Sequence, residues 1–270
     1  MSTPWIRWAG SKWRALSALR VVLENRKYDY YVEPFVGAGS VYFKLARPVA
    51  AVLSDVNRDL ISFYTHLQRD PHELWRLSQE FPLKFSVDFY VEIRKKFNVL
   101  PLGLERAATF FFLNRTCFNG IYRVNKKGEF NVPIGRRRFQ YPRLESFLRL
   151  SSKLQSAEIL DCDFELTARY ARRGVLYYLD PPYTATQRGS SYNRYSWPPF
   201  RTADLERLRD FVATIVARGA HVVVSYAGNK MPWFLPRHFG LKRFKVFRSI
   251  SSDGSRGDKV EVCAFFWQRE

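Results

Sequence analysis

Four consecutive residues carry the clearest chemical signal in the chain. Asp180, Pro181, Pro182 and Tyr183 directly follow the apolar run of residues 174–179. Two adjacent prolines fix the backbone and remove two N–H donors, so the segment offers a rigid set of carbonyl and carboxylate acceptors. Such a set suits a group that only donates hydrogen bonds, and the tyrosine ring can stack on a planar base. We predict a pocket for the exocyclic N6 amine of adenine, against the alternative of a strand-ending turn plugged by a tyrosine.

A glycine-rich turn follows the first apolar run. Gly37 and Gly39 allow the backbone to approach a ligand and direct the start of a helix at it. Tyr42 stands where the third glycine of a dinucleotide fingerprint would fall, which disfavours an NAD-type site. Asp55 ends the next run, 22 residues after Glu33, where an acid can accept hydrogen bonds from ribose hydroxyls. The pattern predicts a ligand with an adenosine part; the alternative is a plain turn and a capping aspartate.

Short apolar runs alternate with helix-like segments. The runs end at Gly37, Asp55, Asp163, Asp180 and Tyr226. Near-continuous apolar runs are typical of strands buried on both faces of a parallel sheet, and residues 202–218 indicate a connecting helix that opens with a threonine cap. We therefore predict a doubly wound α/β fold. Residues 242–250 and 259–267 flank a turn-rich segment and predict an antiparallel C-terminal hairpin.

The alternation stops between residues 57 and 144. This stretch is mostly helical in pattern, and residues 119–138 contain many turn residues together with Lys and Arg, which predicts a hairpin or a long loop. We predict an inserted subdomain over residues 57–144. Residues 1–56 and 145–270 then form the main domain.

Composition limits the partners and the compartment. Lys and Arg total 44 against 25 Asp and Glu, a formal charge of +19. Such an excess favours a polyanionic partner, with nucleic acid first and an anionic membrane second. No apolar run has the length of a membrane span, and the N-terminus does not resemble a signal peptide. The cysteines and histidines show neither a disulfide framework nor metal-ligand spacing, and no phosphate-binding loop or serine-hydrolase motif occurs. We expect a cytoplasmic protein without a metal.

Together these motifs resemble the Dam-type DNA adenine-N6 methyltransferases, the alpha group of the D12 class. RWAGSK at residues 7–12 resembles the first cofactor motif, in which glycine is usual at the position of Ser11. VEPFVGAGSVYF at residues 32–43 is similar to the glycine-rich motif, and residues 114–135 are similar to the DNA-reading hairpin. DPPY at residues 180–183 resembles the catalytic motif, and RSISSDGSR resembles the late loop before the last strand. The five motifs follow the family order over nearly the whole chain.

The resemblance implies a Rossmann-like methyltransferase sheet with an inserted helical DNA-recognition subdomain. It implies S-adenosyl-L-methionine as methyl donor and S-adenosyl-L-homocysteine as product, with Asp55 on the ribose. The implied cofactor-binding residues are Trp8, Ala9, Gly10, Lys12, Glu33, Pro34, Phe35, Gly37, Gly39, Ser40, Asp55, Asp163, Phe164 and Asp180. Asp163 and Phe164 flank the cofactor adenine, and the Cβ of Ser11 narrows the approach to the cofactor.

The resemblance also implies the catalytic residues Asp180, Pro181, Pro182 and Tyr183. Asp180 and the Pro181 carbonyl accept hydrogen bonds from N6–H and direct the nitrogen lone pair at the methyl group, and the proton leaves after transfer. A base inside a duplex cannot enter such a pocket, so the adenine is flipped out and stacked on Tyr183. The loop of residues 184–200 is expected to close over the cofactor or the flipped base.

The insertion is expected to read double-stranded DNA. Arg123 suits a bidentate contact to guanine and Asn119 suits a base edge, while an aromatic residue wedges beside the flipped base. The DNA-binding candidates are Arg7, Phe118, Asn119, Ile121, Arg123, Asn125, Lys126, Lys127, Arg136, Arg137 and Arg138. The lysines and the three consecutive arginines are expected to contact phosphates. GATC, or a longer site containing GAT, is the expected target.

Other functions stay open at this point. Cytosine-N4 methyltransferases more often carry Ser at the position of Asp180, and protein-glutamine or rRNA enzymes more often carry Asn, so the aspartate favours adenine. A DNA-binding module without catalysis is the alternative from a different class. We expect a monomer of bacterial or phage type, held at the nucleoid by DNA, and the sequence leaves open whether a cognate restriction enzyme accompanies it.

Overall fold

One sheet positions most of the candidate residues. The computed structural model describes residues 5–23, 26–46, 49–136, 138–141, 143–182, 200–227, 230–248 and 257–268. Of the candidate site residues, Tyr183 and Arg137 lie outside this part of the chain, as do residues 184–199 of the predicted closing loop and residues 249–256.

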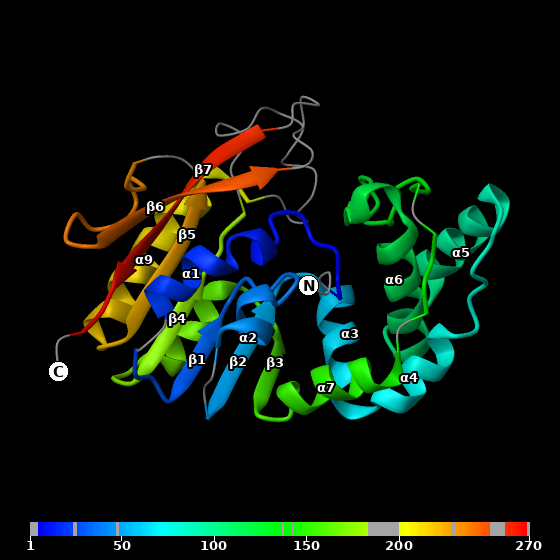
Figure 1. The fold of residues 1–270 in the computed structure, drawn as a ribbon, viewed down its shortest axis with the longest axis horizontal. Helices are drawn as coiled ribbons and strands as arrows, with labels where there is room; N and C mark the ends of the chain where they lie inside the picture. The colour runs from blue at the N-terminus through cyan, green and yellow to red at the C-terminus, as the bar shows by residue number, and fades with distance from the viewer. Residues whose placement is uncertain are drawn as a thin grey trace.

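In the described chain, seven strands form the sheet in the order β3-β2-β1-β4-β5-β7-β6 (Figure 1). The strands are β1 Tyr30–Glu33, β2 Ala50–Asp55, β3 Ala157–Asp161, β4 Val175–Leu179, β5 His221–Ala227, β6 Gly240–Arg248 and β7 Gly257–Phe266. β1 to β5 pair in parallel, and β7 runs antiparallel to both β5 and β6. The predicted mostly parallel α/β sheet with an antiparallel C-terminal hairpin is confirmed.

Helices cover both faces of the sheet, which explains why its central strands are apolar throughout. On one face lie η1 Lys12–Arg14, α1 Leu16–Leu23 and α2 Ser40–Lys44, and on the other lie η3 Phe164–Tyr170 and α9 Thr202–Ala217 (Figure 1). All five residues of β4 are buried. The apolar run before Asp180 is therefore a central strand, β4. Its burial fixes the position of Asp180 at the carboxyl end of the strand.

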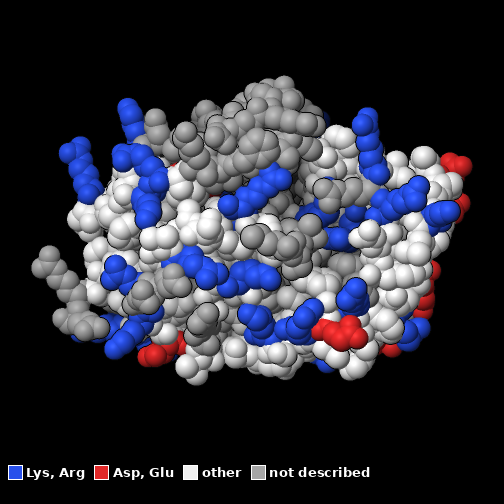
Figure 2. Space-filling view, in the orientation of Figure 1, with Lys and Arg blue, Asp and Glu red and all other residues white. Residues whose placement is uncertain are grey.

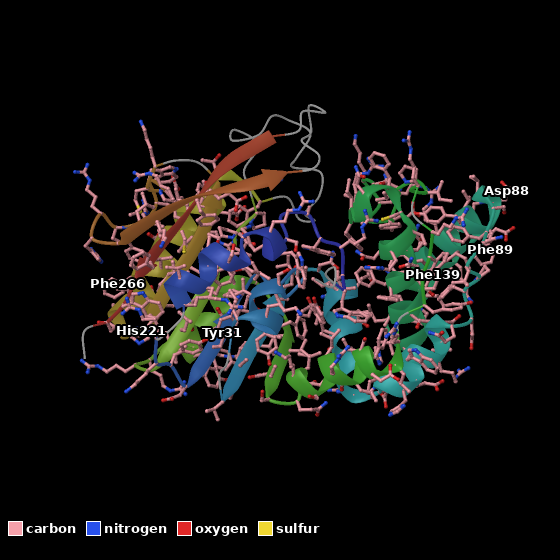
Figure 3. All side chains as sticks on the ribbon, viewed as in Figure 1. Tyr31, Asp88, Phe89, Phe139, His221 and Phe266 are labelled. Carbon is pink, nitrogen blue, oxygen red and sulfur yellow. The ribbon has the colours of Figure 1, made fainter. Side chains whose placement is uncertain are left out.

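The inserted helices pack beside the sheet around an aromatic core. They are α3 Arg58–Arg69, α4 Pro71–Ser78, α5 Val87–Val99, α6 Leu104–Thr116 and η2 Phe118–Gly120; α7 Leu144–Leu154 follows them at the return to the main domain. Phe139 packs against Phe111 and Phe112 of α6, with ring centroids 6.2 and 5.1 Å away (Figure 3). α3 contacts both the insertion and strands β2 and β3, so one core continues from the sheet into the insertion. The domain boundaries at residues 57 and 144 stay a prediction.

Two local details refine the sequence reading. The turn-rich segment after α6 forms a hairpin-like strand pair with isolated bridges from Cys117 to Ile134 and from Val124 to Phe130. The predicted threonine cap of α9 is wrong: residue 202 is already helical, and the backbone N–H of Arg201 donates to the Asp204 carboxylate at 2.6 Å. The Asp204 side chain, three residues after Arg201, accepts the hydrogen bond from the backbone N–H at the start of the helix. The helix therefore starts directly after Arg201 without a threonine cap.

Across the described residues, none of the helices combines the length and the apolarity required to span a bilayer.

Candidate active site

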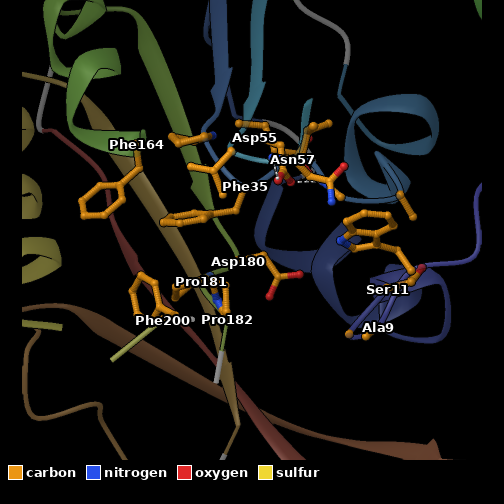
Figure 4. A pocket seen from close by; sticks show the side chains of 18 of the residues that line it. Ala9, Ser11, Phe35, Asp55, Asn57, Phe164, Asp180, Pro181, Pro182 and Phe200 are labelled. Atoms are coloured by element: carbon orange, nitrogen blue, oxygen red, sulfur yellow. Dashed lines mark hydrogen bonds between the residues drawn. The ribbon is translucent and has the colours of Figure 1, made fainter. Parts of the chain in front are cut away.

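A cavity of about 190 Å³ opens at the carboxyl ends of β1, β2 and β4, with its walls drawn in Figure 4. Of the predicted cofactor residues it is lined by Trp8, Ala9, Gly10, Lys12, Glu33, Pro34, Phe35, Gly37, Ser40, Asp55, Asp163, Phe164 and Asp180. Pro181 and Pro182 also line it. Figure 4 shows Phe35, Phe164 and Phe200 on one side and Ser11 and Ala9 on the other, with the Asp180 carboxylate between them.

The glycine turn joins β1 to α2 at the floor of the cavity. Gly37 and Gly39 have φ of +46° and +60°, in the left-handed region that favours glycine. A Cβ on Gly37 would lie 2.7 Å from the Trp8 indole, so the turn and the N-terminal motif pack without space between them. Gly39 does not line the cavity; a Cβ there would lie 2.6 Å from the Phe43 ring. Gly39 therefore contributes to the conformation of the turn, on the side away from the cavity.

Asp55 at the end of β2 holds this turn and faces the cavity. Its carboxylate accepts hydrogen bonds from the backbone N–H of Gly37 at 3.1 Å and of Asn57 at 3.0 Å. Burial raises the pKa of Asp55 to about 6, although these two hydrogen bonds favour the ionised form. Burial also raises the pKa of Glu33 well above its usual range, while the Tyr31 hydroxyl donates to Glu33 at 2.9 Å and opposes the rise.

A buried ion pair fixes the predicted catalytic carboxylate. The Lys12 Nζ lies 2.6 Å from Asp180 Oδ1 and donates to the Gly10 carbonyl at 2.9 Å. The lysine side chain is 4% exposed and the aspartate side chain 19% exposed. The aspartate therefore faces the cavity, while the lysine that pairs with it is almost completely shielded from solvent. An uncompensated charge at this depth would be costly, and each partner therefore holds the other in place.

The wall opposite Lys12 is aromatic and ionic. The Phe35 and Phe164 rings lie 5.3 Å apart between centroids. The Arg207 guanidinium of α9 lies 5.0 Å from the Phe164 ring and pairs with Asp163 at 2.8 Å, Glu165 at 2.7 Å and Asp204 at 2.9 Å. This network fixes Asp163 and Phe164, the predicted neighbours of an adenine ring, against α9.

Comparisons with known proteins agree on one family. The family model described as D12 class N6 adenine-specific DNA methyltransferase matches residues 8–253. This chain belongs to that family. It is 34% identical to the Type II methyltransferase M.MjaIII of Methanocaldococcus jannaschii, over 94% of each chain. It is 31% identical to a DNA adenine methylase of Haemophilus influenzae, over 99% of this chain and 94% of the relative. It is also 35% identical to a DNA N-6-adenine-methyltransferase of Escherichia phage P1, over 95% of this chain and 34% of the relative.

In this methyltransferase, two of the predicted DNA-reading residues are exposed at the base of the hairpin, directly after α6. Phe118 is 49% exposed, and Asn119 is exposed in a left-handed conformation with φ of +54°. Arg123 is half-buried; its Nε donates to the Asn131 side chain at 2.8 Å and an η nitrogen donates to the Asn131 carbonyl at 3.2 Å. Asn131 thereby sets the plane of the guanidinium.

Two other candidates have their polar groups engaged within the methyltransferase. Arg7 donates to the carbonyls of Arg115 and Cys117 at 3.5 and 3.4 Å, which ties the N-terminal segment to the insertion. Asn125 closes the hairpin turn by accepting from the backbone N–H of Lys127 and Glu129 at 2.9 and 3.0 Å. Their contacts to DNA stay a prediction.

The basic candidates of the methyltransferase are open to solvent. Lys126, Lys127, Arg136 and Arg138 are all exposed. On the face drawn in Figure 2, Lys and Arg side chains spread over both the sheet and the insertion, whereas acidic side chains lie mainly toward the edges. This distribution fits a polyanionic substrate.

Several lining residues of the methyltransferase cavity were not predicted. They are Val36, Ala38, Val41, Val56, Asn57, Tyr122, Tyr178, Asp204 and Arg207; Ser11, noted as a departure from the family motif, lines it too, as does Phe200, the last residue of the loop expected to close over the cofactor. Asn57 follows Asp55 closely and caps α3 by accepting from the Leu60 N–H at 2.9 Å, a position that the sequence pattern could have indicated. Tyr122 and Arg207 lie far in sequence from the strand ends that form the cavity, and no local sequence pattern indicated that they would line it. Within the described residues, no cluster of His, Cys, Asp or Glu has a metal-binding arrangement.

Proposed function

We propose that this methyltransferase transfers a methyl group from S-adenosyl-L-methionine to N6 of an adenine flipped out of duplex DNA, within GATC or a longer site containing GAT. The observation that carries the proposal is Asp180. Its carboxylate stands at the end of a fully buried strand, faces the cavity and is braced by Lys12, with Pro181 and Pro182 directly behind it.

The cavity suits a cationic nucleoside. Its described lining contains five carboxyl groups, Glu33, Asp55, Asp163, Asp180 and Asp204, and two cations, Lys12 and Arg207. Lys12 pairs with Asp180 and Arg207 with Asp163 and Asp204, and burial favours the neutral form of Glu33. The lining therefore has no excess of positive charge, in a chain with a formal charge of +19. S-adenosyl-L-methionine carries a sulfonium and an ammonium group, and its ribose and adenine match Asp55 and the Phe35–Phe164 wall. When bound, it supplies an electrophilic methyl group.

The residues of the chain then orient the amine. The adenine N6 amine is a poor nucleophile because its lone pair is delocalised into the ring. Hydrogen bonds from N6–H to Asp180 and to the Pro181 carbonyl favour a pyramidal nitrogen whose lone pair points away from both acceptors. Lys12 keeps the carboxylate from rotating, and the positioning contributes several kcal/mol, within the range of about 7–11 kcal/mol known for oriented groups. A neutral amine is too weak an acid to lose its proton first, so Asp180 takes up or passes on that proton only after transfer.

The hairpin supports the assignment of duplex DNA as substrate. Phe118, exposed at the base of the hairpin, is suited to fill the space that the flipped base leaves, and Arg123 to contact guanine. Lys126, Lys127, Arg136 and Arg138 supply phosphate contacts. We place the enzyme as a monomer in the cytoplasm of a bacterial or phage-infected cell, where its DNA lies; a partner restriction enzyme is not needed for this chemistry.

Sequencing of DNA from cells that express the enzyme, with detection of modified bases, tests the proposal. We expect N6-methyladenine in one short site, with GATC as the first candidate. Asp180→Ala and the milder Asp180→Asn should lower methylation of that site by about 100-fold or more, on the order of a lost preorganised contact, while duplex binding persists. Asp88→Asn, at an exposed position of α5, is the control and should methylate normally. Methylcytosine in place of methyladenine, or full turnover by Asp180→Asn, would refute the proposal.

A further inference from the structure

Tyr122 connects the DNA-reading hairpin to the cavity. Among the described residues of the predicted insertion, 57–144, Asn57 and Tyr122 line the cavity; Asn57 lies directly beside the end of β2, so Tyr122 is the lining residue that comes from the hairpin. Every other described lining residue comes from the N-terminal segment, the sheet edge or the elements near α9. Tyr122 lies between Ile121 and Arg123, two of the predicted DNA-reading residues. A single side chain of the hairpin therefore completes the wall of the cavity.

A buried network of hydrogen bonds fixes the hydroxyl end of this tyrosine. Its hydroxyl donates to Asp59 Oδ2 of α3, and Asp59 Oδ1 accepts from the Arg106 Nε of α6 at 2.6 Å. Arg106 also donates to the carbonyls of Phe97 and Leu100, each at 2.6 Å. Asp59 is 5% exposed, so its charge is balanced almost wholly by Arg106. The ring of Tyr122 is thus held by two inserted helices rather than by the hairpin alone.

On its cavity side Tyr122 contacts the N-terminal motif. Its ring centroid lies 5.9 Å from that of Trp8, with the planes inclined by 30°. The Trp8 indole in turn covers Gly37 so closely that a Cβ there would lie 2.7 Å from it. A continuous series of contacts leads from the hairpin through Tyr122 and Trp8 to the glycine turn.

A second connection runs beside the first. The Arg7 backbone N–H donates to the Asn114 Oδ1 at 2.8 Å, and the Asn114 Nδ2 donates to the Arg7 carbonyl at 2.7 Å. This reciprocal pair fixes the backbone directly before Trp8 to the end of α6, from which the hairpin emerges. Displacement of the hairpin therefore displaces Trp8, and an ordered Trp8 orders the hairpin.

We infer that Tyr122 is a positioning residue that couples the two substrates, so that occupancy of the cofactor cavity strengthens duplex binding at the hairpin and the reverse. The inference rests on the proposed function, because it takes the cavity as the cofactor site and the hairpin as the DNA reader. A ligand that orders Trp8 against Tyr122 favours the hairpin conformation that meets DNA, and by linkage DNA favours the cofactor by the same factor. A direct contact of Tyr122 with either substrate is not required.

Binding measurements with the full chain test the coupling. The duplex carries the site found by modified-base sequencing, and its dissociation constant is measured by fluorescence anisotropy with and without saturating S-adenosyl-L-homocysteine. For the unaltered chain we expect the product to tighten duplex binding about 5-fold or more, the usual lower range of coupling. Calorimetry of S-adenosyl-L-homocysteine binding with and without the duplex should give the same factor.

Two substitutions distinguish the contribution of the Tyr122 ring from that of its hydroxyl group. Tyr122→Leu removes the aromatic contact with Trp8 and should lower the coupling to less than about 2-fold, within the scatter of uncoupled sites. Tyr122→Phe keeps the ring but loses the bond to Asp59, which Arg106 still pairs, and should retain an intermediate factor. Tyr90→Phe is the matched control: it removes a hydroxyl that donates to the Val132 carbonyl at 3.0 Å, in the insertion but outside the cavity lining. This control should keep the full coupling.

The outcomes distinguish the inference from the function on which it rests. Full coupling in Tyr122→Leu, or equal duplex affinity with and without the product in the unaltered chain, overturns the inference and leaves the proposed activity standing. Failure of the unaltered chain to bind S-adenosyl-L-homocysteine at all overturns both. Loss of coupling in Tyr90→Phe as well would show that general loosening of the insertion, not Tyr122, is responsible, and it also overturns the inference.

Discussion

Replacing Asp55 by asparagine should remove a pH-dependent loss of stability while weakening the cofactor site. Asp55 is an acid whose ionised form is disfavoured by burial, even though two backbone N–H groups donate to it. The Gly37 N–H donates to Oδ2 and the Asn57 N–H to Oδ1, so asparagine keeps an acceptor for one of these groups and turns its own amide donors toward the other. The substitution therefore removes the cost of burying a charge, but it adds a pH-independent cost of about 1–3 kcal/mol for the lost hydrogen bond.

The pKa of Asp55 gives the size and the sign of the effect. It lies at about 6 in the folded chain against an ordinary value of 3.8, a difference that corresponds to roughly 3 kcal/mol of free energy of unfolding. Between these two values the folded chain holds a proton that the unfolded chain has lost. The stability that this proton contributes is full below about pH 4 and is lost as the pH rises through about 6. Asparagine has no such loss, so the stability of Asp55→Asn relative to the unaltered chain should rise by at most roughly 3 kcal/mol between pH 4 and pH 8.

Urea unfolding of both chains at pH 4, 6 and 8 measures this difference. We expect the free energy of unfolding of Asp55→Asn, taken relative to that of the unaltered chain, to rise with pH and to level off above pH 6. Asp210→Asn, at a position 69% exposed on α9, is the control and should show no such rise. Calorimetry should also show weaker binding of S-adenosyl-L-homocysteine, because the ribose loses an ionised acceptor. A stability difference that does not change with pH, or that falls as the pH rises, would refute the burial argument.

Three further substitutions test the site. Gly37→Ala should weaken S-adenosyl-L-homocysteine binding at least 10-fold, because the added Cβ would lie 2.7 Å from the Trp8 indole. Gly128→Ala is the control: Gly128 also has a positive φ, but a Cβ there has no atom within 4 Å, so this variant should bind S-adenosyl-L-homocysteine normally. Arg207→Gln should weaken the same ligand by loosening Asp163 and Phe164, with unchanged duplex affinity, and Arg209→Gln on the exposed side of α9 should do neither. Replacing Lys126 and Lys127 together by alanine should lower the slope of log affinity against log salt by about 2 without changing the preferred site; an unchanged slope would exclude both as phosphate contacts.

The sequence alone predicted the parts of this molecule that depend on local pattern. Apolar runs marked β1 to β5 because strands buried on both faces need nearly every residue apolar. The same runs placed Asp55 and Asp180 correctly, since the carboxyl ends of parallel strands meet at one edge of a sheet. The glycine-rich turn at Gly37 and Gly39 was predicted from its position after a strand, and the structure has both residues at positive φ. The family motifs then supplied roles for these residues, most of which stay predictions.

The tertiary structure alone decided which distant side chains complete the site. Tyr122 and Arg207 reach the cavity from a hairpin and a helix that no periodic pattern connects to it, and their anchors Asp59 and Asp163 are far from them in sequence. Arg7 and Asn125, predicted as DNA contacts, also hydrogen-bond to the backbone of the folded chain, which the linear sequence did not indicate; their contacts to DNA stay a prediction. Local order follows from the physics of neighbouring residues, whereas the partners of a buried polar group depend on how elements pack, which the linear sequence does not state.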